Sequence, residues 1–284
     1  MSDGALPSRQ AAPRLARAEG RLALSFRVRS GITVVGRFEQ AGCLRARLPR
    51  PERGAFSGAV TLNTAGGIAS GDRLDLSIAW HEEARATVSA AAAERVYRAR
   101  PAEAAARVAT TLTVALGATA EWLPQETILF DGARLERSLA VELGEGAGLV
   151  AVEALVFGRT ARGETMREGL LVDRVSVHRG GALVHADVTR LDGKVAEILA
   201  RRAVADGAAA VASLIAAGPS VASALAPLRE ALGSAPRAEG GASLRDGLLL
   251  ARIVARDGAA LRRSVLAALA ALRHDRPVPR VWHC

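Results

Sequence analysis

Short apolar runs separated by turn residues fill the chain from about Arg21 to Val188. Runs such as LALSFRVR, GITVVGRF, LDLSIAW and VATTLTVAL alternate, or nearly alternate, between apolar and polar positions and are rich in valine and threonine. Gly146, Gly148, Gly180 and Gly181 are typical of turns that need a positive φ angle. No run of helical spacing and ordinary length interrupts the series, so folds built from βαβ units are disfavoured. We predict that this region is mostly β.

After Asp192 the chain becomes rich in alanine and leucine, and its apolar positions change to helical spacing. PSVASALAPLREALG predicts a helix that begins near Ser220 and stops at Gly233. AALRRSVLAALAALRHD predicts a stronger helix, because its leucines and Val265 fall on one stripe while its arginines lie elsewhere. GLLLARIVARDG, between the two, is compatible with a strand. Residues 207–218, GAAAVASLIAAG, fit a helix by propensity and a buried strand by length and flanking glycines.

The pattern shows no repeat of fixed period and no clean domain boundary. Residues 1–20 are predicted to be a flexible lead-in, since they lack the apolar core of a signal peptide. Residues 21–284 form the predicted single domain, β-rich over 21–190 and helix-containing over 191–275. Residues 207–228 carry no charge, but alanine dominates them and a Gly-Pro pair interrupts them, so membrane insertion is disfavoured. We expect a cytoplasmic protein without membrane contact.

The basic excess of the chain, +9, comes almost wholly from arginine, because Lys194 is the sole lysine. A bias toward arginine and alanine often follows genomic base composition, so it is weak support for nucleic-acid binding. Aromatic residues make up only 3% of the chain and leave few platforms on which bases stack. Cys43 and Cys284 are too few for a disulfide framework. Nucleic acid is therefore not the expected partner.

Recognised catalytic and metal-binding patterns are missing from the sequence. It contains no Gly-x-x-x-x-Gly-Lys-Ser/Thr for nucleotide phosphates and no Gly-x-Ser-x-Gly for a nucleophilic serine. It contains no Cys-x-x-Cys and no His-Glu-x-x-His for zinc, and its five histidines are scattered. His283 and Cys284, at the end of the chain, are assigned no role. We therefore predict no catalytic residues and no permanently bound metal or other cofactor.

Single carboxylates embedded in apolar stretches are the chemistry that remains. Such a residue either points to solvent from a strand with one buried face, or is buried and needs a partner. Glu153, in LVAVEALVFG, is the strongest candidate for burial, because a strand with apolar neighbours on both sides is usually covered on both faces. The other carboxylates of this kind are Glu121, Glu126, Asp131 and Glu164.

Several stretches, in order from about Thr61 to Trp282, resemble the landmarks of the UreD (UreH) family of urease accessory proteins. They are LNTAGGIASGD, VYRAR, EWLPQETILFDGARLERSL, EALVFGRTARGE and the closing PRVW. The block from EWLPQET to FGRTARGE is the most specific. The sequence departs from the family pattern at Ala69 and Ser70, where the family often has glycines. It departs again in GRFEQAGCLRARLPRPERG, which lacks the aromatic residue expected after the proline.

The resemblance implies a non-enzymatic maturation factor with a mostly β fold of β-helical character, flanked by helices in the C-terminal third. Such a protein would bind urease apoprotein directly and recruit the adaptor UreF and, through UreF, the GTPase UreG. Nickel would then reach the urease active site, as transient cargo and not as a cofactor of this chain. The resemblance also favours a strand over a helix for residues 207–218.

The resemblance suggests a role for the loop LNTAGGIASGD, residues 62–72. Gly66, Gly67 and Gly71 would permit tight backbone conformations. They would place Asp72 at the mouth or wall of an internal passage for nickel. In the alternative interpretation, Asp72 only caps a turn.

Asp72 and Glu153 match acidic positions that the family uses along such a passage. Oxygen ligands suit transit, because they hold nickel more weakly than imidazole or thiolate and let it exchange. In the alternative interpretation Glu153 pairs with an arginine. Three further acidic positions match the family with no role implied: Glu126, Asp131 and Glu164.

Two other functions stay open at the level of sequence. The charge of +9 fits a basic binding module for nucleic acid or another acidic partner, whose complexes would depend steeply on salt. Convergence of Asp72, Glu126 and Glu153 on one pocket would instead fit a metal-dependent enzyme, which would retain its ion through purification.

Overall fold

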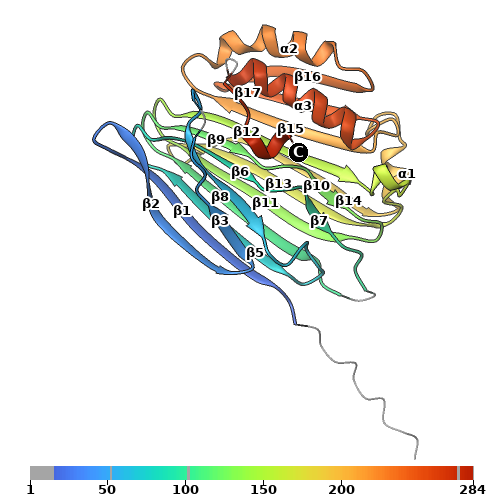
Figure 1. Ribbon diagram of the computed structural model, residues 1–284. Helices are drawn as coiled ribbons and strands as arrows, with labels where there is room; N and C mark the ends of the chain where they lie inside the picture. Colours follow the sequence, from blue (N-terminus) through green and yellow to red (C-terminus); the bar gives the residue numbers. More distant parts are fainter. Residues whose placement is uncertain (1–15, 52, 101–102, 274–275, 284) are drawn as a thin grey trace, which may run out of the picture.

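The alternating runs form strands, and the chain places them in two sheets that pack face to face (Figure 1). The computed structural model describes residues 16–51, 53–100, 103–273 and 276–283. We call the first sheet A; its strand order is β14-β13-β11-β8-β5-β1-β2. Its strands are β1 (Glu19–Arg29), β2 (Ile32–Gly42), β5 (Arg73–Trp80), β8 (Ala106–Val114), β11 (Arg134–Leu143), β13 (Gly169–Arg179) and β14 (Ala182–Gly193).

The second sheet, sheet B, has the order β16-β17-β15-β12-β9-β6-β4-β3, and the short strands β7 and β10 attach to β12 through β10. Its strands are β3 (Leu44–Arg47), β4 (Ser57–Asn63), β6 (Arg85–Ala90), β7 (Glu94–Val96), β9 (Thr119–Leu123), β10 (Thr127–Leu129), β12 (Gly148–Phe157), β15 (Ala210–Ala217), β16 (Ala238–Arg245) and β17 (Leu248–Ala255). The helices are α1 (Val195–Leu199), α2 (Leu225–Gly233) and α3 (Gly258–Arg273), with 3-10 turns η1 (Thr160–Arg162), η2 (Val221–Ala224) and η3 (Arg280–His283).

The middle of the chain follows a β-helical course. From β4 to β13 the long strands alternate between the two sheets, and neighbours within each sheet are parallel. The short strands add a third ladder, in which the buried residues Ile68, Val96, Leu129 and Phe157 lie next to one another in turn. The predicted β-helix-like stack of a mostly β, α+β fold is confirmed. Its strands are parallel without helical crossovers, because each connection returns through the opposite sheet.

Strand β12 is buried on both faces, as its unbroken apolar run predicted. Leu149, Ala151 and Leu155 pack into the core between the two sheets. Val150 and Val152 pack into a second core, under the helices. Because side chains alternate along a strand, Glu153 shares the face of Leu149 and points between the sheets.

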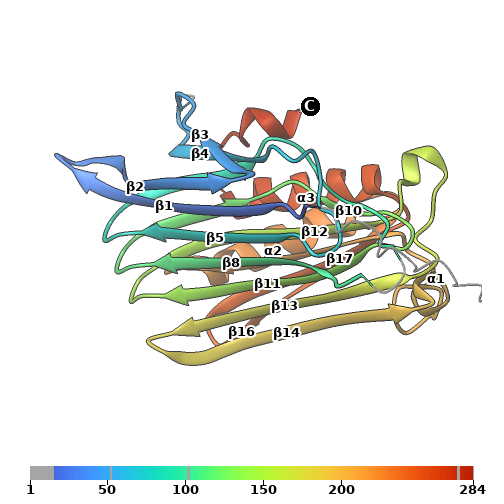
Figure 2. The ribbon, with the colours of Figure 1, turned by 90° about the horizontal axis from the view of Figure 1, so that it is seen from below.

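Both predicted C-terminal helices form, and they cover the face of sheet B that points away from sheet A (Figure 1). Figure 2 shows the molecule from the side of sheet A, whose strands lie in front. The apolar stripe of α3 is buried at Leu261, Val265 and Leu269. Helix α2 begins one 3-10 turn after Ser220 and ends at Gly233. Residues 207–218 contain strand β15, as the resemblance favoured. A strand forms there because it lies between β12 and β17 and pairs with both.

Residues 207–228 fold as β15, the turn η2 and the start of α2. In the part of the chain that the structure describes, no helix is long and apolar enough to cross a membrane. Strand β1 begins at Glu19, and most of the predicted lead-in lies outside the described residues. The division into a lead-in and one domain stays a prediction.

A buried ion pair joins α3 to sheet B. Glu121, on β9, and Arg273, at the end of α3, are 0% and 1% exposed, with 2.9 Å between Oε2 and Nη2. Arg276 adds a second guanidinium at 2.8 Å, and the hydroxyl of Thr87 donates to the same carboxylate. Burial alone would raise the pKa of Glu121, but the two guanidiniums and the hydroxyl hold it below its ordinary value.

We predict that Glu121→Gln lowers the free energy of unfolding by about 3 to 5 kcal/mol, because Arg273 stays buried without a carboxylate partner. Urea denaturation of the purified chain measures this. The matched control is Glu197→Gln, which breaks the exposed pair with Lys194 and is expected to cost less than about 1 kcal/mol. Equal losses in the two variants would contradict the prediction.

The loop between β4 and β5 contains the glycines that the sequence singled out. Gly66, Gly67 and Gly71 have φ angles of 78°, 152° and 82°, so the predicted tight conformations are present. At Gly67 space is also limiting, since a Cβ atom would lie 2.5 Å from the ring of Tyr97. Tyr97 closes over the loop and donates its hydroxyl proton to the Gly66 carbonyl at 2.6 Å.

Gly67→Ala is expected to destabilise the chain by about 2 kcal/mol or more, through an unfavourable φ angle and displacement of the Tyr97 ring. Gly66→Ala is the control, because its φ angle is also positive but nothing lies within 4 Å of the added Cβ; it is expected to cost about 1 kcal/mol. Thermal unfolding of both variants tests the difference, and a smaller loss for Gly67→Ala would refute the steric argument.

Candidate functional site

A cavity of about 270 Å³ lies between the two sheets. The loop of residues 62–72 forms part of its wall through Asn63, Gly66 and Ile68. The remaining wall is largely aliphatic, which leaves a few polar groups to determine its chemistry. The polar lining includes Asn63, Glu94, Arg95, Gln125, Thr127, Arg137 and Glu153.

Glu153 contributes a carboxylate that residues of two strands, β9 and β11, hold in place. Its Oε2 lies 2.6 Å from Nη1 of Arg137, on β11. Trp122, on β9, donates its indole N–H to Oε1 at 2.7 Å. Arg137 also forms a bidentate pair with Asp173, on β13, at 3.0 and 2.6 Å. Glu153 therefore pairs with an arginine, as the alternative interpretation held, and it lines the cavity as well.

The group of Glu153, Arg137 and Asp173 has two carboxylates and one guanidinium. Burial raises the pKa of Glu153, and the negative charge of Asp173 adds to this, because Arg137 compensates only one of the two acids. The pKa of Arg137 is raised by both carboxylates despite its burial. The group has a formal charge of −1 when fully ionised. A proton or a cation in the cavity would balance it.

Glu94, on β7, is a second carboxylate in the cavity wall. It accepts hydrogen bonds from the Asn63 amide at 3.3 Å and from the Arg95 backbone N–H at 3.1 Å. Burial raises its pKa. Within the described residues no arginine or lysine lies within ion-pair distance of it. The sequence analysis did not single out Glu94, because Glu94 followed by Arg95 resembles an ordinary solvated pair of charges. The preceding run Ala90–Ala93 was the available signal that this segment is partly buried.

Asp72 has the hydrogen bonds of a turn cap. It is 4% exposed and accepts backbone N–H groups from Ala18 at 2.8 Å and Ala69 at 2.7 Å, and its own N–H donates to the Ala69 carbonyl. It is not among the residues that line the cavity. The loop thus reaches the cavity through Leu62, Asn63, Gly66 and Ile68 and not through Asp72. Contact between Asp72 and nickel stays a prediction.

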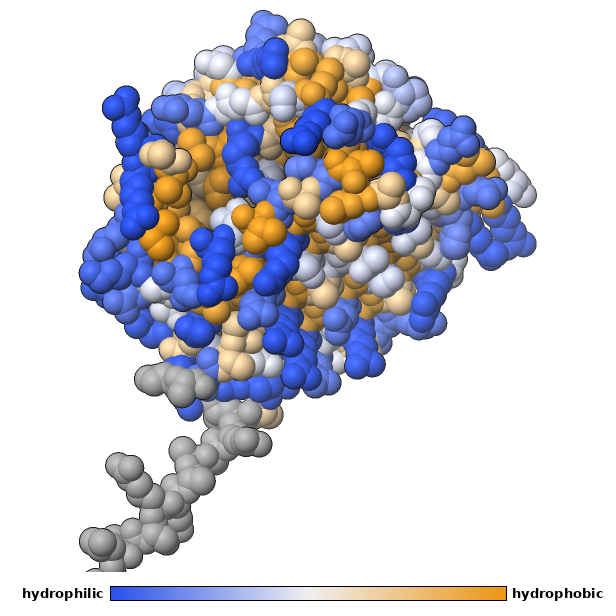
Figure 3. Space-filling model, turned by 180° about the vertical axis from the view of Figure 1, so that it is seen from behind, coloured by the Kyte–Doolittle hydropathy of each residue, from blue (hydrophilic) through white to orange (hydrophobic). Residues whose placement is uncertain are grey.

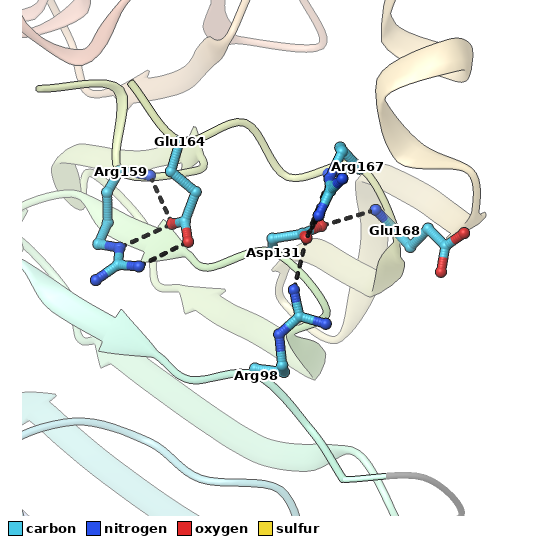
Figure 4. Close-up of polar contacts among 6 residues, drawn as sticks. All are labelled: Arg98, Asp131, Arg159, Glu164, Arg167 and Glu168. Carbon is cyan, nitrogen blue, oxygen red and sulfur yellow. Dashed lines mark hydrogen bonds and ion pairs between the residues drawn. The ribbon is translucent and has the colours of Figure 1, made fainter. Parts of the chain in front are cut away.

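Asp131 and Glu164 lie together in a group of ion pairs (Figure 4). Asp131 accepts from Nη2 of Arg98 at 2.6 Å, from Nη2 of Arg167 at 3.0 Å, and from the backbone N–H groups of residues 167 and 168. Glu164 forms a bidentate pair with Arg159 at 2.8 and 2.7 Å. Asp131 joins loops to one another, and Glu164 closes the β12–β13 connection on itself; neither lines the cavity.

Glu126 fixes the C-terminal segment. It pairs with Arg262 of α3 at 3.0 Å. Arg262 donates to the Trp282 carbonyl at 3.0 Å and lies over the indole ring, whose N–H donates to the Leu123 carbonyl. The closing PRVW is therefore anchored on sheet B. His283 ends η3 and is exposed, whereas Cys284 lies outside the described residues.

No three His, Cys, Asp or Glu side chains of the described ranges gather in a group suited to a metal ion. Asp72, Glu126 and Glu153 do not converge on the cavity, which only Glu153 of the three lines. The geometry therefore gives no support to a fixed metal centre built from these three acids, and the prediction that no metal is permanently bound stays untested.

The Asp131 pairs predict a pH-dependent contribution to stability. Burial raises the pKa of Asp131, but its backbone N–H and guanidinium donors lower it from 3.8 to about 2. Since the folded pKa is depressed, the stabilisation is present above pH 3.8 and is lost as pH falls toward 2. We expect Asp131→Asn to cost roughly 1 to 2 kcal/mol at neutral pH, because both arginines are exposed and solvent screens them.

Urea denaturation at pH 6 and again near pH 2.5 tests this, and the difference between wild type and Asp131→Asn should shrink in acid. Glu82→Gln is the control, since Glu82 is exposed and forms no ion pair with the described residues. A difference that is the same at both pH values would exclude the charge effect.

Comparison with known proteins gives one family. A family model described as UreD urease accessory protein matches residues 18–283. The urease accessory protein UreD of a Methylobacterium species is 46% identical, over 95% of this chain and 96% of its own. Urease accessory protein UreD 3 of a Bradyrhizobium species is 45% identical over 94% of each chain, and the UreD of Azorhizobium caulinodans is 44% identical over 95% and 98%. The matched stretches include the loop, the cavity strands and the anchored C-terminus, and the chain belongs to the UreD family of urease accessory proteins.

Proposed function

We propose that this chain is a non-catalytic urease maturation factor of the cytoplasm. It binds urease apoprotein, recruits UreF and through it the GTPase UreG, and provides a carboxylate-lined passage for nickel. Membership of the family supports the role in urease maturation. The partners and the passage are the proposal.

The uncompensated carboxylates in the cavity carry the proposal. Glu153 shares Arg137 with Asp173, and Glu94 accepts hydrogen bonds but has no ion-pair partner among the described residues. Buried acids that serve only stability are usually paired. An excess of negative charge in an enclosed space attracts cations, because the low dielectric strengthens the interaction.

The donor set suits transit better than storage. The cavity-lining residues include two carboxylates and two side-chain amides but no imidazole or thiolate, and such oxygen ligands would hold nickel weakly enough for it to move on. Burial raises the pKa of Glu94 and of Glu153, and a divalent ion that binds them would compete with protons for the same oxygens. Passage of nickel through the cavity needs no fixed coordination geometry.

The test is urease activation at limiting nickel in cells that co-express urease, UreF, UreG and this chain. We expect the double variant Glu94→Gln with Glu153→Gln to lower activation by roughly tenfold while capture of urease apoprotein is unchanged; tenfold corresponds to about 1.4 kcal/mol. Glutamine keeps the hydrogen bonds to Asn63 and Trp122, and Arg137 keeps Asp173. Excess nickel should restore part of the activity.

Glu82→Gln serves as the exposed acidic control and should activate normally. Full activation by the double variant, at normal protein levels, would refute the passage. Failure of the wild-type chain to capture urease, with no loss of activation when it is omitted, would refute the maturation role. Asp72→Asn separates the two roles of that residue: a loss of activation beyond the loss of folded protein would place Asp72 on the nickel path.

A further inference from the structure

Two exposed arginines share one buried carboxylate on the loops beside the short β7–β10–β12 ladder (Figure 4). Arg98 follows β7, Asp131 follows β10 and Arg167 precedes β13. The side chain of Asp131 is 8% exposed, whereas those of Arg98 and Arg167 are 64% and 76% exposed. Both guanidiniums reach the same oxygen, Oδ2.

The arginines are only partly satisfied. Arg98 uses Nη2 alone, and Arg167 uses Nε and Nη2, so Nη1 of each makes no hydrogen bond within the described ranges. One carboxylate cannot neutralise two guanidiniums, so the trio has a formal charge of +1. Arg100 and Arg162, on the same two loops, are exposed as well, and neither side chain forms an ion pair with a described residue.

The surrounding contacts hold these guanidiniums in place before any ligand arrives. Asp131 also accepts the backbone N–H groups of residues 167 and 168, which fixes the loop before β13. Arg159 is tied to Glu164 and lies 4.4 Å from the centroid of the Phe130 ring, which packs edge-on against Tyr97. Guanidiniums that are already ordered lose little entropy on binding, and their planar donors match a carboxylate.

We propose that Arg98 and Arg167 form a docking surface for a glutamate- or aspartate-rich segment of a partner protein. A carboxylate of the partner would accept hydrogen bonds from the remaining guanidinium N–H groups, in the way that the Asp131 carboxylate already does. A protein acid fits better than a nucleic acid, because the planar donors of each guanidinium match one separate carboxylate, whereas the exposed Glu168 is an unfavourable neighbour for a continuous phosphate backbone. The nearby rings of Tyr97 and Phe130 pack edge-on against each other, and Phe130 also contacts Arg159, so they offer no free platform for bases.

The surface adjoins the candidate site. Arg95, three residues before Arg98, lines the cavity together with Glu94 and Gly66. A docked segment would therefore lie next to the cavity wall. The docking itself does not depend on the proposed passage, and a binding assay without urease tests it separately.

The experiment is fluorescence anisotropy of the full chain with a fluorescein-labelled glutamate-rich peptide at about 50 mM salt, where charge interactions are weakly screened. The same peptide with glutamine at every glutamate is the neutral probe. We expect wild type to prefer the glutamate peptide and to release it as salt rises. The pair Arg98→Gln with Arg167→Gln should weaken binding about tenfold or more, since hydrogen bonds between charged groups are lost.

The control is Arg27→Gln with Arg174→Gln, which removes the same charge from exposed positions on β1 and β13. It should change the affinity for the peptide less than about twofold, because salt screens charges that lie away from the docking surface. Equal binding of the two peptides or equal loss in the two arginine pairs would overturn the proposal. So would tighter binding of a single-stranded oligonucleotide of the same charge.

Discussion

Burial of carboxylates within a two-sheet structure is the constraint that the arrangement of this protein depends on. An ionised acid removed from water is costly unless charge or hydrogen bonds replace its hydration. Glu121, Glu126 and Asp131 meet this requirement with arginines from distant segments, and Asp72 meets it with backbone N–H groups. Each pair connects parts of the chain: α3 to β9, the C-terminal segment to sheet B, and the loops beside the short ladder to one another.

The same requirement separates structural acids from candidate functional ones. Glu121 has two guanidiniums and a hydroxyl, and its pKa is lowered despite complete burial. Glu153 shares a single guanidinium with Asp173, and burial raises its pKa. Glu94 accepts hydrogen bonds and has no ion-pair partner among the described residues. Glu94 and Glu153 therefore differ from Glu121, Glu126 and Asp131, whose charges arginines balance, and from Asp72, which backbone N–H groups of a turn satisfy; they are the candidates for binding a cation.

The β-helical course explains why these groups meet. Successive strands alternate between sheets, so residues from β7, β9, β11 and β12 surround one space although they are far apart in the chain. The third ladder of Ile68, Val96, Leu129 and Phe157 fixes the corner next to it. The loop of residues 62–72 enters the wall there because Gly67 lets Tyr97 close over it.

The sequence by itself determined the elements and much of their placement. Alternation predicted the strands, helical spacing predicted α2 and α3, and the apolar run around Glu153 predicted a strand covered on both faces, because these signals come from neighbouring residues. Family motifs added the β-helical stack and the strand at residues 207–218, which propensity alone left open. Tertiary structure alone decided which acid pairs with which arginine, since partners such as Glu121 and Arg273 are 152 residues apart. It also decided that Asp72 caps a turn and that Glu94 lines the cavity, because both depend on how sheets, loops and strands meet in space.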